Sequence, residues 1–372
     1  MLFRSNTDGS YKINNIRSGT YKAFGLKDVN SNYIFDSEEE HVGFSDSLIT
    51  ISKNTKQNFV LFKEEPLKQK LRKAIFAEHG HIIFSFTKPA KTYSKLHFLS
   101  QEPKEKVLAE HSINNDTLHY WFTEDLKEFM KIEISEEGKI LDTVLLRPIT
   151  TEQAKTSSRG NKWMLVSTLN VGKDKPFDFK KPIVIKFNHP IQEKNVNEIN
   201  LESGGKKILF TNQADFSDDT FRNFFFHFPF NQDSSYKLFI PPGTFTDIFG
   251  LKNDTIKINF KTQEEKYYGT LKLILTMKSN PKYILHLINE KGEVFDSGTY
   301  QWQESVAGRR IYSFLYLPPG AYKIRIIYDT NGDGKWTTGN YFAKRQPEKV
   351  IYFSGAVTIR SNWDLEVDWK VE

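Results

Sequence analysis

The sequence contains no cysteine, which excludes disulfides, thiolate nucleophiles and zinc–thiolate sites. No apolar run approaches the ~20 residues that a membrane-spanning helix needs. The N-terminus, MLFRSNTDGSYK, lacks the apolar stretch of ~7–15 residues that marks a signal peptide. Taken literally, the sequence therefore predicts neither a membrane span nor an export signal.

Basic stripes and catalytic motifs are also absent. The net charge is +6, but lysine and arginine are spread along the chain, whereas nucleic-acid binding needs a basic stripe or an aromatic platform. The chain has no His-Glu-x-x-His zinc motif, no Gly-x-Ser-x-Gly elbow and no glycine-rich phosphate loop. His79 and His81 could form a metal pair on a strand, although two solvated histidines are the simpler interpretation. We therefore expect no nucleic-acid partner and no enzyme activity.

Aromatic residues and strand-like alternation are abundant. Phe, Tyr and Trp make up 14% of the chain, with 31 Phe and 16 Tyr. Apolar residues recur at every second position, the period of a β-strand, in four clear stretches: Phe224–Phe230, Tyr236–Ile240, Leu271–Met277 and Trp363–Val371. Gly- and Pro-containing turns separate them, which predicts an all-β chain of tandem antiparallel β-sandwiches. The stretch Pro66–Glu78 alone suggests a helix.

Three polar or charged breaks divide the chain. They lie at Lys63–Lys70, Ile149–Lys162 and Lys261–Lys266, and the second is expected to be a loop or linker. The predicted segments are residues 1–66, 67–150, 151–263 and 264–372.

An internal repeat links the two ends of the chain. SGTYKAFGLKDVNSNYIFD in segment one aligns without gaps with PGAYKIRIIYDTNGDGKWT in segment four, so Gly19 meets Gly320 and Asp28 meets Asp329. We interpret these as two copies of one domain type. Far fewer residues precede Gly19 than precede Gly320 within its segment. We therefore expect that Met1 is not the natural start of the first copy and that a signal sequence would lie upstream.

Each copy carries an oxygen-rich loop whose spacing suits calcium. A calcium loop places ligands at positions 1, 3, 5, 7 (a backbone carbonyl), 9 and 12. In loop one these are Asp28, Asn30, Asn32, Ile34, Asp36 and Glu39. In loop two they are Asp329, Asn331, Asp333, Lys335, Thr337 and Asn340. Loop one has the better ligands but Tyr33 at the turn, where loop two has Gly334. The alternative is a pair of Asx turns without metal.

Segment three carries the motifs of a known family. It opens with Pro182–Ile191, PIVIKFNHPI, and closes with Leu238–Thr255, LFIPPGTFTDIFGLKNDT. These resemble the two ends of the S-layer-type bacterial immunoglobulin-like domain, and segments one and four are similar to the transthyretin-like, carboxypeptidase-regulatory-like sandwich. Segment two is assigned as a β-sandwich by its strands alone. The resemblance implies an exported, typically lipid-anchored protein of the Gram-negative cell envelope without known catalysis.

These observations predict a non-catalytic structural, adhesion or assembly module of the cell envelope. Its partner would be an unknown protein or glycan, and it would touch a membrane only through an N-terminal lipid anchor that this sequence lacks. Bound Ca²⁺ would stiffen a loop or a domain junction. The alternative is a carbohydrate-binding or accessory module of an envelope hydrolase, with Trp302 and Trp336 as flat platforms for a sugar, although buried tryptophans at strand ends are commoner.

Overall fold

The fold is that of a computed structural model of the chain. It describes residues 3–36, 38–66, 68–90, 94–105, 107–112, 114–156, 163–172, 175–208, 214–216, 221–278, 281–301 and 309–371. The described chain is all-β, and its α-helix is the short α1 (Thr151–Thr156). Among the described residues no helix has the length and apolar character that a bilayer crossing requires. The chain forms two compact units, one of Met1–Pro66 with Thr270–Glu372 and one of Leu67–Gly269.

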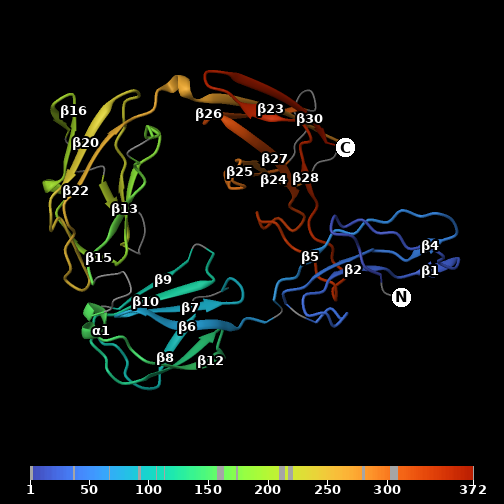
Figure 1. Ribbon diagram of the computed structural model, residues 1–372, viewed down its shortest axis with the longest axis horizontal. Coiled ribbons are helices and arrows are strands. Elements are labelled where there is room, and N and C mark those ends of the chain that lie inside the picture. The colour runs from blue at the N-terminus through green and yellow to red at the C-terminus, as the bar shows by residue number, and fades with distance from the viewer. Residues whose placement is uncertain are drawn as a thin grey trace. The chain divides into compact units, whose positions relative to one another are not determined.

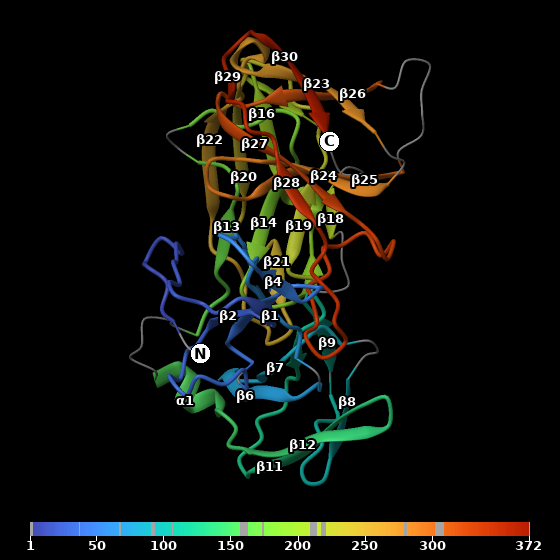
Figure 2. The ribbon, with the colours of Figure 1, turned by 90° about the vertical axis from the view of Figure 1, so that its right-hand side faces the viewer.

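The second unit begins with a two-layer sandwich. One sheet has the order β6-β7-β10-β9 and the other the order β12-β11-β8. Their bounds are β6 (Leu71–Glu78), β7 (His81–Phe86), β8 (Lys95–Phe98), β9 (Leu108–His111), β10 (Thr117–Trp121), β11 (Met130–Glu136) and β12 (Lys139–Leu146). Figures 1 and 2 show β6, β7 and β9 in one layer and β8 and β12 in the other. Alternate residues such as Ile82, Phe84, Ile132 and Ile134 fill the core between them.

A second sandwich completes this unit. Its sheets have the orders β13-β14-β19-β18 and β17-β16-β20-β22, with β15 and β21 paired beside them. The bounds are β13 (Ser167–Leu169), β14 (Ile183–Phe187), β15 (Ile191–Lys194), β16 (Asn200–Ser203), β17 (Lys206–Ile208), β18 (Ala214–Phe216), β19 (Asn223–Phe226), β20 (Ser235–Ile240), β21 (Phe245–Asp247) and β22 (Ile256–Lys261). Phe187, Phe224, Tyr236 and Phe245 are among its fully buried residues.

The C-terminal part of the first unit is also a sandwich. Its sheets have the orders β26-β23-β30 and β25-β24-β27-β28, and β29 also pairs with β27. The bounds are β23 (Gly269–Met277), β24 (Lys282–Ile288), β25 (Val294–Gln301), β26 (Arg309–Leu317), β27 (Gly320–Tyr328), β28 (Val350–Tyr352), β29 (Val357–Ile359) and β30 (Asp364–Val371). The pairing of β23 with β30 is parallel, in contrast to the antiparallel pairs among β24, β25, β27, β28 and β29.

The N-terminal part of this unit has the same strand register as its repeat partner. It contains β1 (Gly19–Tyr21), β2 (Phe24–Lys27), β3 (His41–Phe44), β4 (Ile49–Ile51) and β5 (Phe62–Lys63). Gly19 pairs with Ile51 as Gly320 pairs with Ile359. The pairs of β2 with β3 likewise match those of β27 with β28. The Tyr21 hydroxyl donates to the carbonyl four residues earlier, and Tyr322 does the same. The sequence repeat is therefore a structural repeat.

Among the predicted stretches, one is buried as expected and two differ from the expectation. Leu271, Leu273, Leu275 and Met277 are all buried, as their alternation predicts, whereas Trp363 at the start of the last stretch is 58% exposed. The suggested helix at Pro66–Glu78 is wrong, because Leu71–Glu78 forms β6 and takes its backbone hydrogen bonds from β7. The neighbouring strand outweighs the local helix preference of this stretch.

The expected linker after segment two contains a helix. Thr150 and Gln153 form a capping box, in which the Thr150 N–H donates to Gln153 Oε1 at 3.0 Å and the Gln153 N–H donates to Thr150 Oγ1 at 3.3 Å. This reciprocal pair starts α1 within the stretch predicted to be irregular. The division of the chain into four segments remains a prediction.

Candidate functional site

The first predicted loop is a turn held together by side-chain oxygens. The Asp28 carboxylate accepts the backbone N–H of Ser31 at 2.7 Å and that of Tyr33 at 2.9 Å. Asn30 and Asn32 each accept a backbone N–H from two residues further along the chain. Because Asp and Asn can bond to nearby backbone N–H groups, this stretch turns without a helix or strand.

The second loop repeats this geometry position by position. The Asp329 carboxylate accepts the N–H of Gly332 at 2.8 Å and that of Gly334 at 3.1 Å. Asn331 and Asp333 each accept a backbone N–H from two residues further on. Two stretches at opposite ends of the chain thus adopt one hydrogen-bonding pattern.

A buried glutamate that the spacing did not single out closes loop one. Glu40 is 1% exposed, and its carboxylate accepts the N–H groups of Val29 at 3.4 Å and Asp36 at 3.1 Å. Glu39, the predicted ligand at position 12, instead pairs with Lys63 at 2.7 Å, and its side chain is 65% exposed. The loop therefore closes on the residue after the predicted one.

Glu348 has the same role in loop two. It is 7% exposed and accepts the N–H groups of Thr330 at 2.7 Å and Thr337 at 2.9 Å. Its backbone carbonyl accepts the indole N–H of Trp336 at 3.1 Å. Glu348 lies eleven residues beyond Thr337, outside any twelve-residue calcium-loop spacing. The sequence spacing therefore does not identify it as part of loop two, and its role is recognised only because it occupies the place of Glu40 in the fold.

The oxygens of both loops suit a hard cation, but here they accept hydrogen bonds. Carboxylate and amide oxygens are the ligands that calcium prefers. Asn30 and Asn32 donate their amide N–H groups to Asp36, and Asn331 donates to Asp333 at 3.0 Å. A calcium ion would take the place of these donors. No three His, Asp or Glu side chains of the described residues are grouped as a metal site.

Hydrogen bonds favour the ionised form of the Asp333 carboxylate in loop two. Burial works against ionisation of Asp333, but the Lys335 N–H and the side chains of Asn331 and Thr337 outweigh burial and keep the pKa of Asp333 below its ordinary value. The carboxylate is therefore ionised over a wide pH range, as a metal ligand must be.

The other predicted ligands have mixed surroundings. Ile34, whose backbone carbonyl is the predicted ligand, is 59% exposed, and Trp336 is 43% exposed. The side-chain oxygen of Asn340 accepts the N–H of Ala343 in the following turn, away from position 12 of loop two. Trp302 lies outside the described residues.

The stretch after loop two packs against the N-terminal segment. Thr338 donates its hydroxyl to the carbonyl of Lys63 at 2.6 Å, and Gln346 donates its amide to the carboxylate of Asp46 at 2.8 Å. The ring of Tyr341 lies edge-on to three phenylalanines, Phe24, Phe35 and Phe44. Loop two thus leads directly into the contact that joins the two parts of the first unit.

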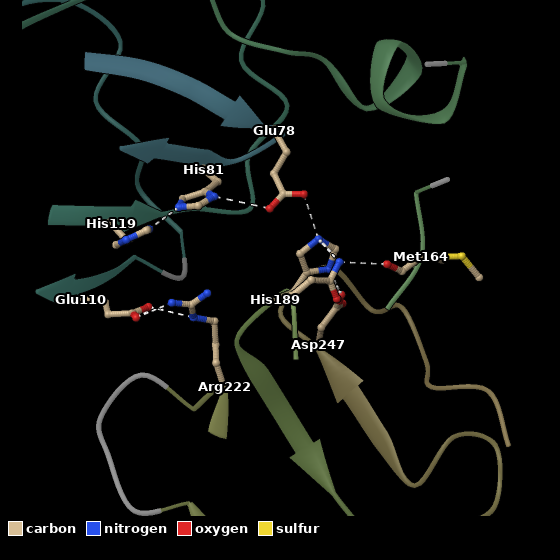
Figure 3. A network of polar contacts seen from close by, with 9 residues as sticks. Glu78, His81, Glu110, His119, Met164, His189, Arg222 and Asp247 are labelled. Carbon is tan, nitrogen blue, oxygen red and sulfur yellow. Dashed lines mark hydrogen bonds and ion pairs between the residues drawn. The ribbon is translucent and has the colours of Figure 1, made fainter. Parts of the chain in front are cut away.

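A second polar cluster lies in the other unit, where its two sandwiches meet (Figure 3). His189 precedes β15, and its Nδ1 donates to Asp247 Oδ2 at 2.6 Å. Its Nε2 lies 3.2 Å from Glu78 Oε2, at the end of β6 in the other sandwich. The side chains of His189 and Asp247 are 1% and 0% exposed. Asp247 also accepts the N–H groups of Phe249 and Leu251, so it is fixed in place.

The cluster continues from Glu78 to a pair of histidines. His81 Nδ1 lies 3.4 Å from Glu78 Oε1, and His81 Nε2 lies 2.9 Å from His119 Nδ1. The His81 ring also stacks on Trp121, with centroids 3.5 Å apart and planes 8° apart. Nearby, Arg222 of the second sandwich makes a two-point ion pair with Glu110 of the first. Charged contacts therefore cross between the sandwiches at two places.

Burial and pairing shift the pKa values of these groups strongly. Burial alone would lower the pKa of His189, but hydrogen bonds to Asp247 and Glu78 outweigh it and raise the pKa to about 9. Burial alone would raise the pKa of Glu78, but His189 and His81 lower it to about 2. Burial lowers the pKa of His81, and burial with the neighbouring His81 lowers that of His119 to about 4. At neutral pH the cluster thus contains a charged His189 and an uncharged histidine pair.

No sequence pattern predicts this cluster. Asp247 follows Glu78 in the chain by more than the length of a sandwich, and no spacing rule connects the two. His79 and His81 do not act as a pair, because His79 contacts the carbonyl of Ile149 at 2.8 Å and the hydroxyl of Thr151 at 3.3 Å. The histidine that meets His81 is His119 on the adjacent strand β10, diagonal to His81 because the direct cross-strand partner of His81 is Trp121.

Comparisons with known proteins give no family. No family model and no curated protein matches the chain. Among solved structures, the S-layer protein rSbsC(31-844) is similar at 12% identity and a TM-score of 0.29, over 80% of this chain and 41% of that one. BcpA, the major pilin subunit of Bacillus cereus, is similar at 10% identity and a TM-score of 0.20, over 70% and 88%. An alpha-2-macroglobulin fragment from Escherichia coli is similar at 8% identity and a TM-score of 0.23, over 54% of this chain and 90% of that one. These scores are too low to carry an argument about function.

Proposed function

We propose that this chain is a non-catalytic structural module of the bacterial cell envelope that serves adhesion or assembly and whose Asp/Asn loops bind calcium. The observation that carries the proposal is the duplicated loop, with the same hydrogen bonds and the same buried glutamate in both copies. In the second copy the loop leads into the packing contact with the N-terminal segment. A cation there would stiffen a junction, which is what a load-bearing or spacer module requires.

A catalytic role is disfavoured by the surroundings of the most perturbed groups. His189 and Asp247 have the Asp–His arrangement that orients a general base, but the Nε2 that would face a nucleophile faces Glu78. His189 is buried, and its raised pKa keeps it charged and unable to accept a proton at neutral pH. A surface hollow of about 540 Å³ lies near Pro176 and Phe177 and includes none of these groups.

The location rests on the motifs of residues 182–191 and 238–255, which resemble the S-layer-type immunoglobulin-like domain. The alternative function, a carbohydrate-binding module, would use the half-exposed face of Trp336. We favour the structural role because the indole N–H of that ring is bonded to the Glu348 carbonyl and so unable to donate to a sugar. The partner would be a protein or glycan of the envelope.

The calcium part of the proposal predicts a modest stabilisation. A site with a Kd of ~0.1 mM in ~1 mM calcium gains about 1.4 kcal/mol, which raises the Tm of a unit of this size by about 3–6 °C. We expect this shift in calorimetric melts of the full chain in 1 mM calcium against excess chelator. Asp28→Ala or Asp329→Ala should reduce it.

Asp254→Ala is the matched control, because Asp254 is an exposed aspartate outside both loops. It should keep the full calcium-dependent shift. Magnesium at the same concentration should give a smaller shift, since it demands stricter octahedral geometry. If chelator leaves the wild-type melt unchanged, both loops are hydrogen-bonded turns and the calcium proposal fails.

A further inference from the structure

The polar cluster of the second unit joins two sandwiches, and we call it the junction network: Glu78, His81, Glu110, His119, His189, Arg222 and Asp247 (Figure 3). Two of its ion pairs cross between the sandwiches, Glu78 with His189 and Glu110 with Arg222. Both crossing contacts lie beside the histidine pair. Both rings belong to the first sandwich, so a charge on the pair acts on the contact between the sandwiches through these two neighbouring ion pairs.

The histidine pair can hold its contact in only some protonation states. The atoms His81 Nε2 and His119 Nδ1 are 2.9 Å apart, so one of them must donate and the other must accept through its lone pair. One proton between the rings satisfies both. When both imidazoles are fully protonated, two N–H groups point at each other and the contact is lost.

We propose that the junction network is an acid-operated latch, closed while His81 and His119 share one proton and opened when both imidazoles become charged. Charged groups surround the pair, and burial outweighs the two carboxylates among them, which by themselves would favour protonation. Glu78 faces His81 from β6 at 3.4 Å, and Glu110 lies opposite His119 in the β9–β10 register. Arg222 reaches in from the second sandwich, 5.7 Å from the ring centre of Trp121, which stacks on His81. A second imidazolium would therefore be buried close to a guanidinium.

The pH window follows from the direction of each pKa shift. The pKa of His119 is lowered from 6.5 to about 4, and that of His81 is lowered too. An open or unfolded state, with ordinary histidines, binds more protons, so the closed state loses stability as the pH falls from about 6.5 to 4. Glu78, with a pKa of about 2, and His189, with a pKa of about 9, stay charged across this range. Within the junction network the histidine pair therefore titrates in this window, while the Glu78–His189 ion pair keeps its charges.

The test measures the separation of the two sandwiches in the full chain. Because the sequence has no cysteine, Lys139→Cys and Lys257→Cys, two exposed positions on different sandwiches, can carry a fluorescent donor and acceptor. We expect energy transfer to fall reversibly between pH 6.5 and 4, with the ratio of open to closed molecules rising at least about tenfold, the equivalent of one unit of pKa shift.

The decisive variant is His119→Asn, whose amide places an N–H donor near the position of Nδ1 but does not titrate. It should keep the transfer constant over this range, while His227→Asn, at an exposed histidine of the same unit, should behave as wild type. A transfer change with the same midpoint in His119→Asn, or no change in wild type, would overturn the proposal.

A second measurement does not depend on how the variant folds. The imidazole titrations of the wild-type chain can be followed by NMR with labelled histidine. The proposal requires that two histidines titrate well below pH 6 and in a coupled manner. If every histidine of the chain titrates at or above pH 6, the latch does not exist.

Discussion

At the residue scale, one glycine sets how closely the two sandwiches of the second unit approach. Gly80, in the turn between β6 and β7, has a φ of +64°, which favours glycine. A Cβ there would lie 2.1 Å from the carbonyl oxygen of Phe122 and 2.8 Å from the Phe249 ring of the other sandwich. Backbone and ring leave no room for a methyl group, so this turn works only with glycine.

We therefore predict that Gly80→Ala destabilises the chain by about 3 kcal/mol, from the left-handed backbone and from overpacking. Gly138→Ala is the matched control, because Gly138 has a φ of +77° and no neighbour within 4 Å. It should cost only about 1–2 kcal/mol. Denaturant unfolding measures both, and equal losses would show that the contact with Phe249 and Phe122 contributes nothing.

At the element scale, the two Asp/Asn loops make one turn from different residues. The turn needs a positive φ at two positions, which are Ser31 (63°) and Tyr33 (61°) in the first loop. In the second they are Gly332 (76°) and Gly334 (74°). Non-glycine residues pay a conformational penalty in this region, so the first loop holds the same shape at a higher cost. The hydrogen bonds from the Ser31 and Tyr33 N–H groups to Asp28 offset this conformational cost in the first loop.

This difference predicts opposite effects of exchanging the residues. Tyr33→Gly should stabilise the first loop by up to about 1 kcal/mol, and Gly334→Ala should destabilise the second by about 1–2 kcal/mol. Tyr33→Ala is the control, since it removes the ring and its bond from Arg4 but keeps the strain. Thermal melts rank the three variants. If Tyr33→Gly and Tyr33→Ala melt at the same temperature, the backbone of this turn is not strained.

At the scale of the whole molecule, the first and last parts of the chain belong to one compact unit. Tyr341 is central to their contact, because its ring meets three phenylalanines of the N-terminal part and its N–H donates to Glu64. In the described part of residues 1–66 the buried apolar side chains are Val42 and Phe62. Because residues 1–66 bury so few apolar side chains, we expect their strands to depend on the contact with Tyr341 for stability.

Tyr341→Ala should accordingly cost about 2–3 kcal/mol, somewhat less than truncating a fully buried aromatic ring. Hydrogen exchange should become faster in β2 and β3 and stay unchanged in β7 and β14 of the other unit. The neighbouring Phe342, which is 70% exposed, supplies the control, and Phe342→Ala should leave exchange in β2 and β3 as it is. Unchanged protection of β2 and β3 in Tyr341→Ala would show that the N-terminal part is ordered without this contact.

The sequence by itself determined the all-β fold and the repeat. Strand alternation is a local property, because side chains on a strand point to opposite faces in turn, and Leu271 to Met277 are buried as that rule requires. The same holds for the turns at Asp28 and Asp329, whose carboxylates accept backbone N–H groups three and five positions further along the chain.

Tertiary structure alone decided which distant residues meet. Leu71–Glu78 is a strand because β7 lies beside it. Glu348 bonds to loop two although it lies outside the twelve residues of a calcium-loop spacing. Glu78 meets His189 across 111 positions of sequence and His189 meets Asp247 across 58. No periodicity encodes such contacts, because they depend on how whole sandwiches pack. The junction network and its shifted pKa values therefore exist only in the folded chain, where burial and pairing act on the same few side chains.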